Sequence, residues 1–274
     1  MSGGVVITVG GCFAREGYIA ADNIHCAEVA AVFTTRNGGV SGLLPGTGHY
    51  KSMNLQIGDS GDSYDNIKEN YRIAASSLGF SADDVVSVRQ KHTDIVLTAD
   101  EAAGGAFEAD ALITDAKGIL LSVRTADCVP VLMYDRVKGA VAAVHSGWRG
   151  TFTRIGVKTL ERMISLYGTD PSDVSAAIGP AIGGCCYEID TDFHERFREE
   201  YGGFIDDFFQ TVNGGKQHCF LSSMNRAFLE RAGIPCENIT VSELCTMCNP
   251  GLFYSHRRSG FKRGTMAAFI GMRN

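Results

Sequence analysis

The chain has 274 residues, of which 45% are hydrophobic and 20% charged, and its formal net charge is −6. This length allows a large buried core, and the acidic balance argues against nucleic acid or an acidic membrane surface as a partner. No stretch approaches the ~20 apolar residues that span a bilayer, and no N-terminal basic segment precedes an apolar one. We therefore expect a cytoplasmic protein whose nine cysteines are reduced thiols.

Apolar periodicity and turn signals predict helices and strands along most of the chain. In chain order, the prediction is a strand at 30–34, a helix at 64–78, strands at 85–90, 111–114, 119–123, 129–134 and 140–145, a helix at 153–167, a strand at 174–178, helices at 190–201 and 222–232, and strands at 239–241 and 266–272. This alternation predicts an α/β (α+β) fold, a layered sandwich of mixed β-sheet covered by helices. We expect a single domain over residues 1–274.

Three residues far apart in the sequence each stand where a predicted strand ends: His92, Cys128 and His145. Two imidazoles and a thiolate suit one zinc ion, and three protein ligands leave a fourth position for water or substrate, as in catalytic zinc sites. The alternative is that the three are unrelated and that Cys128 is a small buried hydrophobe. Asp127 could orient a ligand histidine through its second ring nitrogen, or it could hydrogen-bond its own backbone in a turn.

The predicted strand that ends at His145 continues into a turn with Gly147 and Gly150, before a predicted helix. Free N–H groups and the positive dipole end at a helix start can bind an anion. Arg149 could add a bidentate grip on phosphate or carboxylate. The alternative is a tight turn in which the glycines only permit positive φ and Trp148 belongs to the core.

Two other cysteine pairs carry weaker signals. Cys245 and Cys248 have the spacing of a redox motif, but no second such pair accompanies them, which favours two thiols in a loop beside the pocket wall. Cys185 and Cys186 are adjacent and are expected to line a turn rather than to form a strained vicinal disulfide.

The segments around the three candidate ligands resemble motifs of the bacterial YfiH/YlmD family, also called laccase-domain or polyphenol-oxidase-like proteins. These segments are Gln90-Lys91-His92, Thr125-Ala126-Asp127-Cys128 and Val144-His145-Ser146-Gly147-Trp148-Arg149-Gly150. The resemblance spans nearly the whole chain, and the further similar segments are 33–41, 53–55, 178–180, 186–188, 245–246 and 253–258.

This resemblance implies that His92, Cys128 and His145 are metal ligands, with zinc rather than copper as the occupant. It also implies phosphorolysis of purine nucleosides (adenosine, inosine, guanosine and methylthioadenosine) and hydrolytic deamination of adenosine. Two positions depart from the family pattern: Thr93-Asp94 replaces a glycine, and His256 stands where tyrosine is common. Neither change removes a ligand, and both bear on specificity.

Phosphorolysis requires groups that hold phosphate beside the anomeric carbon. Arg149 and the N–H groups of the turn at Gly147 are the candidates by charge and geometry, and Arg36 or Asn54 could complete the pocket. The resemblance places Arg257 and Arg258 in a shared motif, so that one of them reaches substrate; the alternative is a solvated basic face. These substrate-binding residues join His92, Cys128, His145, Asp127 and Arg149, which are the predicted catalytic residues.

A laccase mechanism does not fit the sequence. Multicopper oxidases use about ten histidines, mostly in His-X-His pairs, since imidazole is the general copper ligand, whereas this chain has seven histidines and no such pair. Two other functions stay open. One is a metal-free cysteine hydrolase with Cys128 as nucleophile and His92 or His145 as base, and the other is a peptidoglycan-precursor editing protein.

Overall fold

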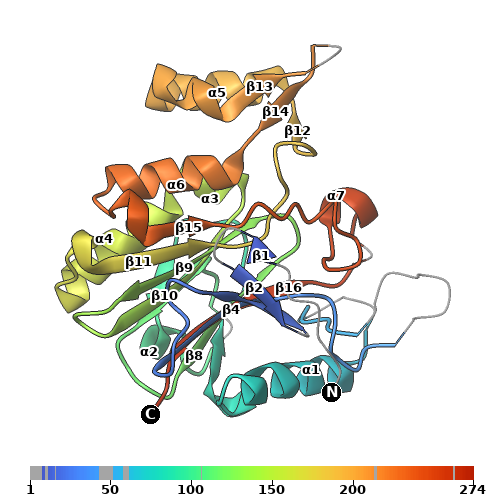
Figure 1. Ribbon diagram of the computed structural model, residues 1–274, viewed down its shortest axis with the longest axis vertical. Helices are drawn as coiled ribbons and strands as arrows, with labels where there is room; N and C mark the ends of the chain where they lie inside the picture. Colours follow the sequence, from blue (N-terminus) through green and yellow to red (C-terminus); the bar gives the residue numbers. More distant parts are fainter. Residues whose placement is uncertain are drawn as a thin grey trace.

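The computed structural model describes residues 8–9, 12–15, 17–42, 52–57, 62–105, 107–212, 215–261 and 263–274. In this part of the chain, two large β-sheets pack face to face and helices cover their outer faces (Figure 1). The first sheet runs in the order β1 (Thr8–Val9), β2 (Cys12–Arg15), β3 (Tyr18–Ala21), β4 (Val29–Thr34), β16 (Met266–Met272), β8 (Leu120–Thr125) and β5 (Val85–Ser87). The second runs β15 (Ile239–Val241), β11 (Val174–Ile178), β9 (Val129–Asp135), β10 (Ala140–Ser146), β7 (Ala111–Thr114) and β6 (Val96–Thr98).

The central strands explain why the sheets pack as layers. All seven residues of β10 are buried. Val141 and Ala143 face the first sheet, and Ala142 and Val144 face the helices on the other side. A strand that is covered on both faces has an almost continuous apolar sequence, which is why this segment shows no alternation of polar and apolar residues.

Helices cover the outer face of each large sheet. Helix α1 (Tyr64–Ser77) packs on the first sheet and begins at Ser63, whose hydroxyl accepts the Asn66 N–H. Helices α4 (Ile155–Tyr167) and α6 (Leu221–Arg231) pack on the second sheet. In Figure 1, α1 lies below the sheets and α4 and α6 above them. The molecule is therefore layered as helix, sheet, sheet, helix, which confirms the predicted fold class.

Beyond α6, a smaller unit extends from the second sheet (Figure 1). It contains the strand order β12 (Glu188–Ile189), β14 (Gln217–Cys219) and β13 (Phe209–Thr211), together with helix α5 (Thr191–Tyr201). Aromatic side chains hold α5: Phe193 packs on Trp148, and Phe197 packs on Phe152. The three short strands were not predicted, because pairing between separate segments defines them.

The predicted helix 153–167 differs from the observed structure at its start. A short helix α3 (Trp148–Phe152) begins directly after Gly147, and α4 begins only at Ile155. The break lies at Arg154, whose φ of 56° is left-handed. The predicted strand 85–90 is also shorter, since β5 ends at Ser87. The remaining short elements are α2 (Ala99–Ala102), α7 (His256–Ser259) and short 3-10 helices at 82–84, 171–173, 203–208 and 236–238.

Among the described residues, no helix is both long and apolar enough to cross a membrane. The cysteines whose side chains the structure describes are all free thiols. The single domain over residues 1–274 stays a prediction.

Candidate metal centre and its pocket

His92, Cys128 and His145 meet at one end of the sandwich. His145 lies in β10, Cys128 in the turn between β8 and β9, and His92 in the loop after β5. One ligand atom from each of them lies within 4.8 Å of the other two. His145 is buried, Cys128 is half-buried and His92 is exposed, so the cluster has an inner and an outer side.

The cluster has the dimensions of a zinc site. With Zn–S near 2.3 Å and Zn–N near 2.05 Å, tetrahedral coordination separates the sulfur and nitrogen by about 3.6 Å. The observed distance between Cys128 Sγ and His92 Nε2 is 3.6 Å. Gly147 fits closely against the same atoms, because a Cβ there would lie 2.7 Å from His92 Cδ2 and 3.0 Å from Cys128 Sγ. Glycine therefore keeps the space between these two ligands open.

Asp110 orients the cluster, and the sequence analysis did not identify it. Its Oδ1 lies 2.7 Å from His145 Nδ1, which leaves Nε2 of that ring to face a metal, the usual carboxylate–histidine–metal arrangement. The same carboxylate accepts the backbone N–H groups of Lys91, His92 and Thr93 and the Thr93 hydroxyl. One buried carboxylate thus fixes both histidine ligands. Its position just before the strand at 111–114 was the available signal.

The departure from the family pattern at Thr93-Asp94 contributes to this arrangement. Thr93 gives two of the hydrogen bonds to Asp110, from its N–H and its hydroxyl. Asp94 forms an ion pair with Lys158 of α4. His92 itself has a φ of 59°, a left-handed conformation that is uncommon outside glycine and that the hydrogen bonds to Asp110 hold in place.

Cys128, His145 and Asp110 shift one another's pKa values. Burial would raise the pKa of the Cys128 thiol, but the imidazoles of His145 and His92 lower it to about 6. Burial would lower the pKa of His145, but the Cys128 thiolate and the Asp110 carboxylate raise it to about 9. Burial would likewise raise the pKa of Asp110, but hydrogen bonds from His145 and Thr93 lower it to about 2. The thiolate is the form that binds metals, whereas His145 carries a proton at neutral pH and would have to release it for its imidazole to bind a metal.

The C-terminal part of the chain holds the Asp127 carboxylate, and its catalytic role stays a prediction. Among the described residues, no hydrogen bond joins it to His92 or His145. Instead it accepts the Thr246 hydroxyl at 2.5 Å, the Ser255 hydroxyl at 3.0 Å and the Arg257 N–H at 2.7 Å. Its φ of 90° is left-handed, a conformation uncommon outside glycine. Asp127 therefore ties the C-terminal segment to the turn that carries Cys128.

A cavity of about 420 Å³ opens beside the cluster, within the range of small-molecule sites. His92 and Cys128 form part of its wall. The wall also includes the Asp127 carboxylate and several aromatic or basic side chains, those of Trp148, Tyr187, His256, Arg257, Phe261 and Arg263. Arg257 was predicted to bind substrate, whereas no such role was predicted for Tyr187, Phe261 or Arg263.

Of the other predicted substrate-binding and catalytic residues, some line this cavity or a neighbouring one and others do not. Arg149 is exposed, stacks on Trp148 at 4.3 Å and lines a neighbouring cavity of about 360 Å³ that also reaches His92. Gly147 caps α3 and contacts the ligands. Among the described residues, those that line the cavity of Cys128 include Arg257 but not Arg36, Asn54 or Arg258.

Those three residues hold neighbouring backbone segments. Arg36 donates to the Pro250 carbonyl and lies over the Tyr254 ring. Asn54 is fully buried and binds Asp62 and the Thr265 N–H. Arg258 donates to the carbonyls of Thr246, Met247 and Phe253. Their substrate-binding roles stay predictions.

The chain is similar to several known proteins over most of its length. The chain is 39% identical to a purine nucleoside phosphorylase of Deinococcus radiodurans over 245 residues, 89% of each chain. It is 35% identical to "Adenosine deaminase RL5", from an unknown prokaryotic organism, covering 86% of this chain and 91% of that one. The crystal structure of the Bacillus licheniformis hypothetical protein YfiH superposes with a TM-score of 0.86 at 35% identity, covering 94% of this chain and 97% of that one.

These matches confirm the resemblance to YfiH/YlmD proteins. The corresponding family is described as "Multi-copper polyphenol oxidoreductase laccase", and it matches residues 30–273. Because this match covers nearly the whole chain, the protein belongs to that family.

Proposed function

We propose that this protein is a zinc-dependent purine nucleoside phosphorylase that also deaminates adenosine. The observation that carries the proposal is the three-ligand cluster, oriented by Asp110, at the wall of a cavity lined with aromatic and basic side chains. Relatives named as a purine nucleoside phosphorylase and as an adenosine deaminase support both reactions. The substrates are adenosine, inosine, guanosine and methylthioadenosine.

The donor set is one that zinc accepts. Two imidazoles and one thiolate, with a separation of 3.6 Å between Cys128 Sγ and His92 Nε2, fit a catalytic zinc site with one open position. When bound, zinc would supply Lewis acidity to a water or substrate atom in the cavity. The family description names laccase chemistry, but seven histidines without a His-X-His pair are too few for a multicopper centre.

Basic residues of the cavity are suited to hold phosphate. The backbone N–H of Arg257 donates to Asp127, and its guanidinium donates to the carbonyls of Cys186 and Glu188. This arrangement places a cation at the cavity wall. Arg263 also lines the cavity and donates to His256 Nδ1 at 3.3 Å. Guanidinium groups favour phosphate because their N–H groups match two of its oxygens.

The two reactions need different nucleophiles in the same cavity. In phosphorolysis a phosphate oxygen forms a bond to the anomeric carbon, the glycosidic C–N bond breaks, and the purine leaves with the electron pair and takes up a proton. In deamination water adds to the amine-bearing ring carbon and ammonia leaves. Tyr187, Trp148 and Phe261 offer flat surfaces for the purine ring, as aromatic side chains commonly do. Arg149, in the neighbouring cavity, is the second phosphate candidate.

The test uses purified protein of known metal content. It is incubated with adenosine, with and without phosphate, and free adenine and inosine are separated by chromatography. We expect phosphate-dependent release of adenine and phosphate-independent formation of inosine, both lost together with one zinc ion in Cys128→Ala. Cys26→Ala is the matched control, since Cys26 is an exposed thiol whose hydrogen bond to Glu28 lies away from both cysteine clusters. Zinc-loaded wild-type protein that turns over no purine nucleoside would overturn the proposal.

The contact between Cys128 and His92 also supports the metal-free cysteine hydrolase as a second candidate. A thiolate beside an imidazole is an activated nucleophile. The two candidates differ in their response to chelators. Activity that survives complete removal of zinc, with a covalent adduct trapped at Cys128, would favour the hydrolase, whereas activity restored only by added zinc would favour the phosphorylase.

A further inference from the structure

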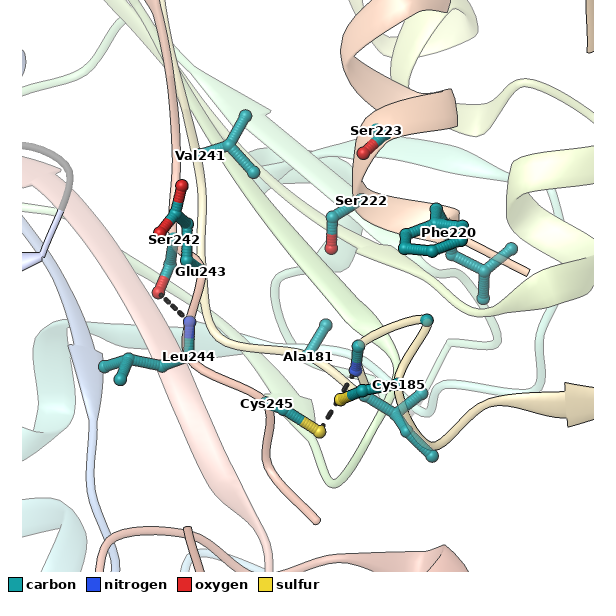
Figure 2. Close-up of a pocket in the computed structure, with 14 residues that line it drawn as sticks. Ala181, Cys185, Phe220, Ser222, Ser223, Val241, Ser242, Glu243, Leu244 and Cys245 are labelled. Carbon is teal, nitrogen blue, oxygen red and sulfur yellow. Dashed lines mark hydrogen bonds between the residues drawn. The ribbon is translucent and has the colours of Figure 1, made fainter. Parts of the chain in front are cut away.

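Four cysteines from two distant parts of the sequence gather at a second place in the molecule. Cys185 and Cys186 lie in the turn between β11 and β12, and Cys245 and Cys248 lie in the loop after β15. All four Sγ atoms lie within 4.8 Å of one another. Cys245 is buried, Cys186 is half-buried, and Cys185 and Cys248 are exposed. Figure 2 shows the sulfurs of Cys185 and Cys245 beside each other at one end of a pocket.

The sulfur spacing is close to that of a tetrahedral zinc site. Four Zn–S bonds near 2.3 Å separate neighbouring sulfurs by about 3.8 Å. The Cys248 sulfur lies 3.3 Å from that of Cys186 and 3.6 Å from that of Cys185. The remaining sulfurs lie within 4.8 Å of one another, so shifts of about 1 Å or less would complete the tetrahedron.

The backbone holds both halves of the cluster in place. Residues Ala181 and Cys245 form a parallel bridge, and the Gly183 N–H donates to Cys245 Sγ at 3.2 Å. Cys186 N–H donates to the Gly183 carbonyl at 2.9 Å, which closes the turn that carries the other two thiols. A Cβ on Gly183 would lie 3.2 Å from Cys185 Sγ. The thiols therefore converge because of the main chain and do not depend on flexible side chains alone.

The charges around the cluster are complementary to a zinc tetrathiolate. Four thiolates and one Zn²⁺ have a formal charge of −2. Two guanidinium groups bind the same backbone segments: Arg257 donates to the Cys186 carbonyl, and Arg258 donates to the carbonyls of Thr246 and Met247. Two arginines thus offset the charge that a bound ion would leave. Without an ion, burial raises the pKa of the Cys185 and Cys186 thiols, so zinc binding would have to displace their protons.

We propose that Cys185, Cys186, Cys245 and Cys248 bind a second zinc ion through four thiolates. A site with four protein ligands and no open position is structural. It would join the turn that leads into Tyr187, a wall of the catalytic cavity, to the segment that contains Thr246 and leads to Arg257. The free energy of binding the ion would then stabilise this wall. This inference stands independently of the reaction catalysed at Cys128.

The first test counts zinc ions per chain after loading with zinc under reducing conditions and passage over a chelating resin. We expect two ions in the wild-type protein, one in Cys248→Ser, one in Cys128→Ala and none in the double variant. Cys236→Ser, which changes an exposed free thiol elsewhere, should keep two. One zinc ion in the wild-type protein that survives in Cys248→Ser and is lost in Cys128→Ala would overturn the proposal.

A second measurement does not depend on the folding of any cysteine variant. The metal-free wild-type protein is titrated with Co²⁺, and the absorption of sulfur-to-cobalt charge transfer is followed. A site with four thiolates should add about four times the intensity of a site with one. A single weak band, or a non-reduced mass that is two hydrogens lower because of a Cys186–Cys248 disulfide, would contradict a zinc tetrathiolate.

Discussion

The two sulfur-containing clusters of this protein differ in composition, in support and in what surrounds them. The cluster of His92, Cys128 and His145 has three ligands of two kinds, is oriented by the buried Asp110, and opens on a cavity. The cluster of Cys185, Cys186, Cys245 and Cys248 has four identical ligand atoms. An incomplete ligand set beside a cavity suits chemistry, whereas a complete one suits structure.

The location of each cluster in the fold supports this contrast. His145 is part of β10, whose residues are all buried between the layers, and packing holds it within narrow limits. The four cysteines lie in loops, and two of them are exposed. Changes at the first cluster should therefore affect activity most, and changes at the second should affect stability most.

The largest effect is expected for Gly147→Ala. The new Cβ would lie 2.7 Å from His92 Cδ2 and 3.0 Å from Cys128 Sγ, so that His92 must move out of ligand position. We expect turnover of adenosine to fall by more than about 100-fold, the upper range for changes outside the ligand set itself. Gly251→Ala is the matched control, since a Cβ there meets no atom within 4 Å. Full activity and metal content in Gly147→Ala would mean that the ion does not lie between these two ligands.

The next largest effect is on zinc affinity, which should differ between variants of Asp110 and Asp127. Asp110→Asn should weaken zinc binding at the catalytic cluster by about 10–100-fold, because the carboxylate that orients His145 is lost. Asp127→Asn changes the residue next to Cys128 in sequence, but its carboxylate binds Thr246, Ser255 and the Arg257 N–H. It should leave the zinc affinity within about threefold. Competition with a chelating dye measures both. Equal losses in the two variants would assign the effect to general damage at the site.

A smaller effect should distinguish the two candidate phosphate ligands. Arg257 lines the cavity of Cys128, so Arg257→Gln should raise the KM for phosphate by about tenfold or more, the value of one charge-assisted hydrogen bond. Arg149→Gln should have a smaller effect, because Arg149 stacks on Trp148 in the neighbouring cavity. Steady-state kinetics at varied phosphate and fixed inosine gives the comparison. The reverse order would place phosphate on the Arg149 side of Trp148.

The smallest effect concerns the connection between the two clusters. The Ser255 hydroxyl donates to Asp127 and accepts the Arg258 N–H at the start of α7. Ser255→Ala should lower the free energy of unfolding by about 1 kcal/mol, the usual value of a helix cap, and Tm by about 2–4 °C. Both zinc ions should remain bound. Differential scanning calorimetry of Ser255→Ala beside Cys26→Ala tests this, and loss of zinc from Ser255→Ala would show that the connection supports the ligands directly.

Most long elements could be predicted from the sequence, because their apolar residues follow a period. Helix α1 and strands β9, β10 and β16 lie within a residue or two of the predicted ranges. The short strands β12, β13 and β14 could not, since hydrogen bonds between distant segments define them. The sequence also did not show that the strands form two packed sheets, because an apolar strand has the same sequence in either arrangement.

The candidate ligands could be predicted because chemistry limits which side chains bind a metal. His92, Cys128 and His145 were identified by residue type and by position at strand ends. Asp110 was missed because a carboxylate has many structural uses, and its contact with His145 crosses 35 positions. The cysteines at 185, 186, 245 and 248 were interpreted as two separate pairs, because the 58 residues 187–244 lie between the pairs.

The sequence by itself determined the fold class, the family motifs and the residue types of the candidate metal cluster, because these depend on local periodicity and on side-chain chemistry. Only the tertiary structure decided which carboxylate holds the histidines, which arginine lines the cavity and that four thiols converge at a second place. These features depend on distances between segments far apart in the chain. Such distances follow from how the two sheets and their loops pack, and no local pattern encodes them.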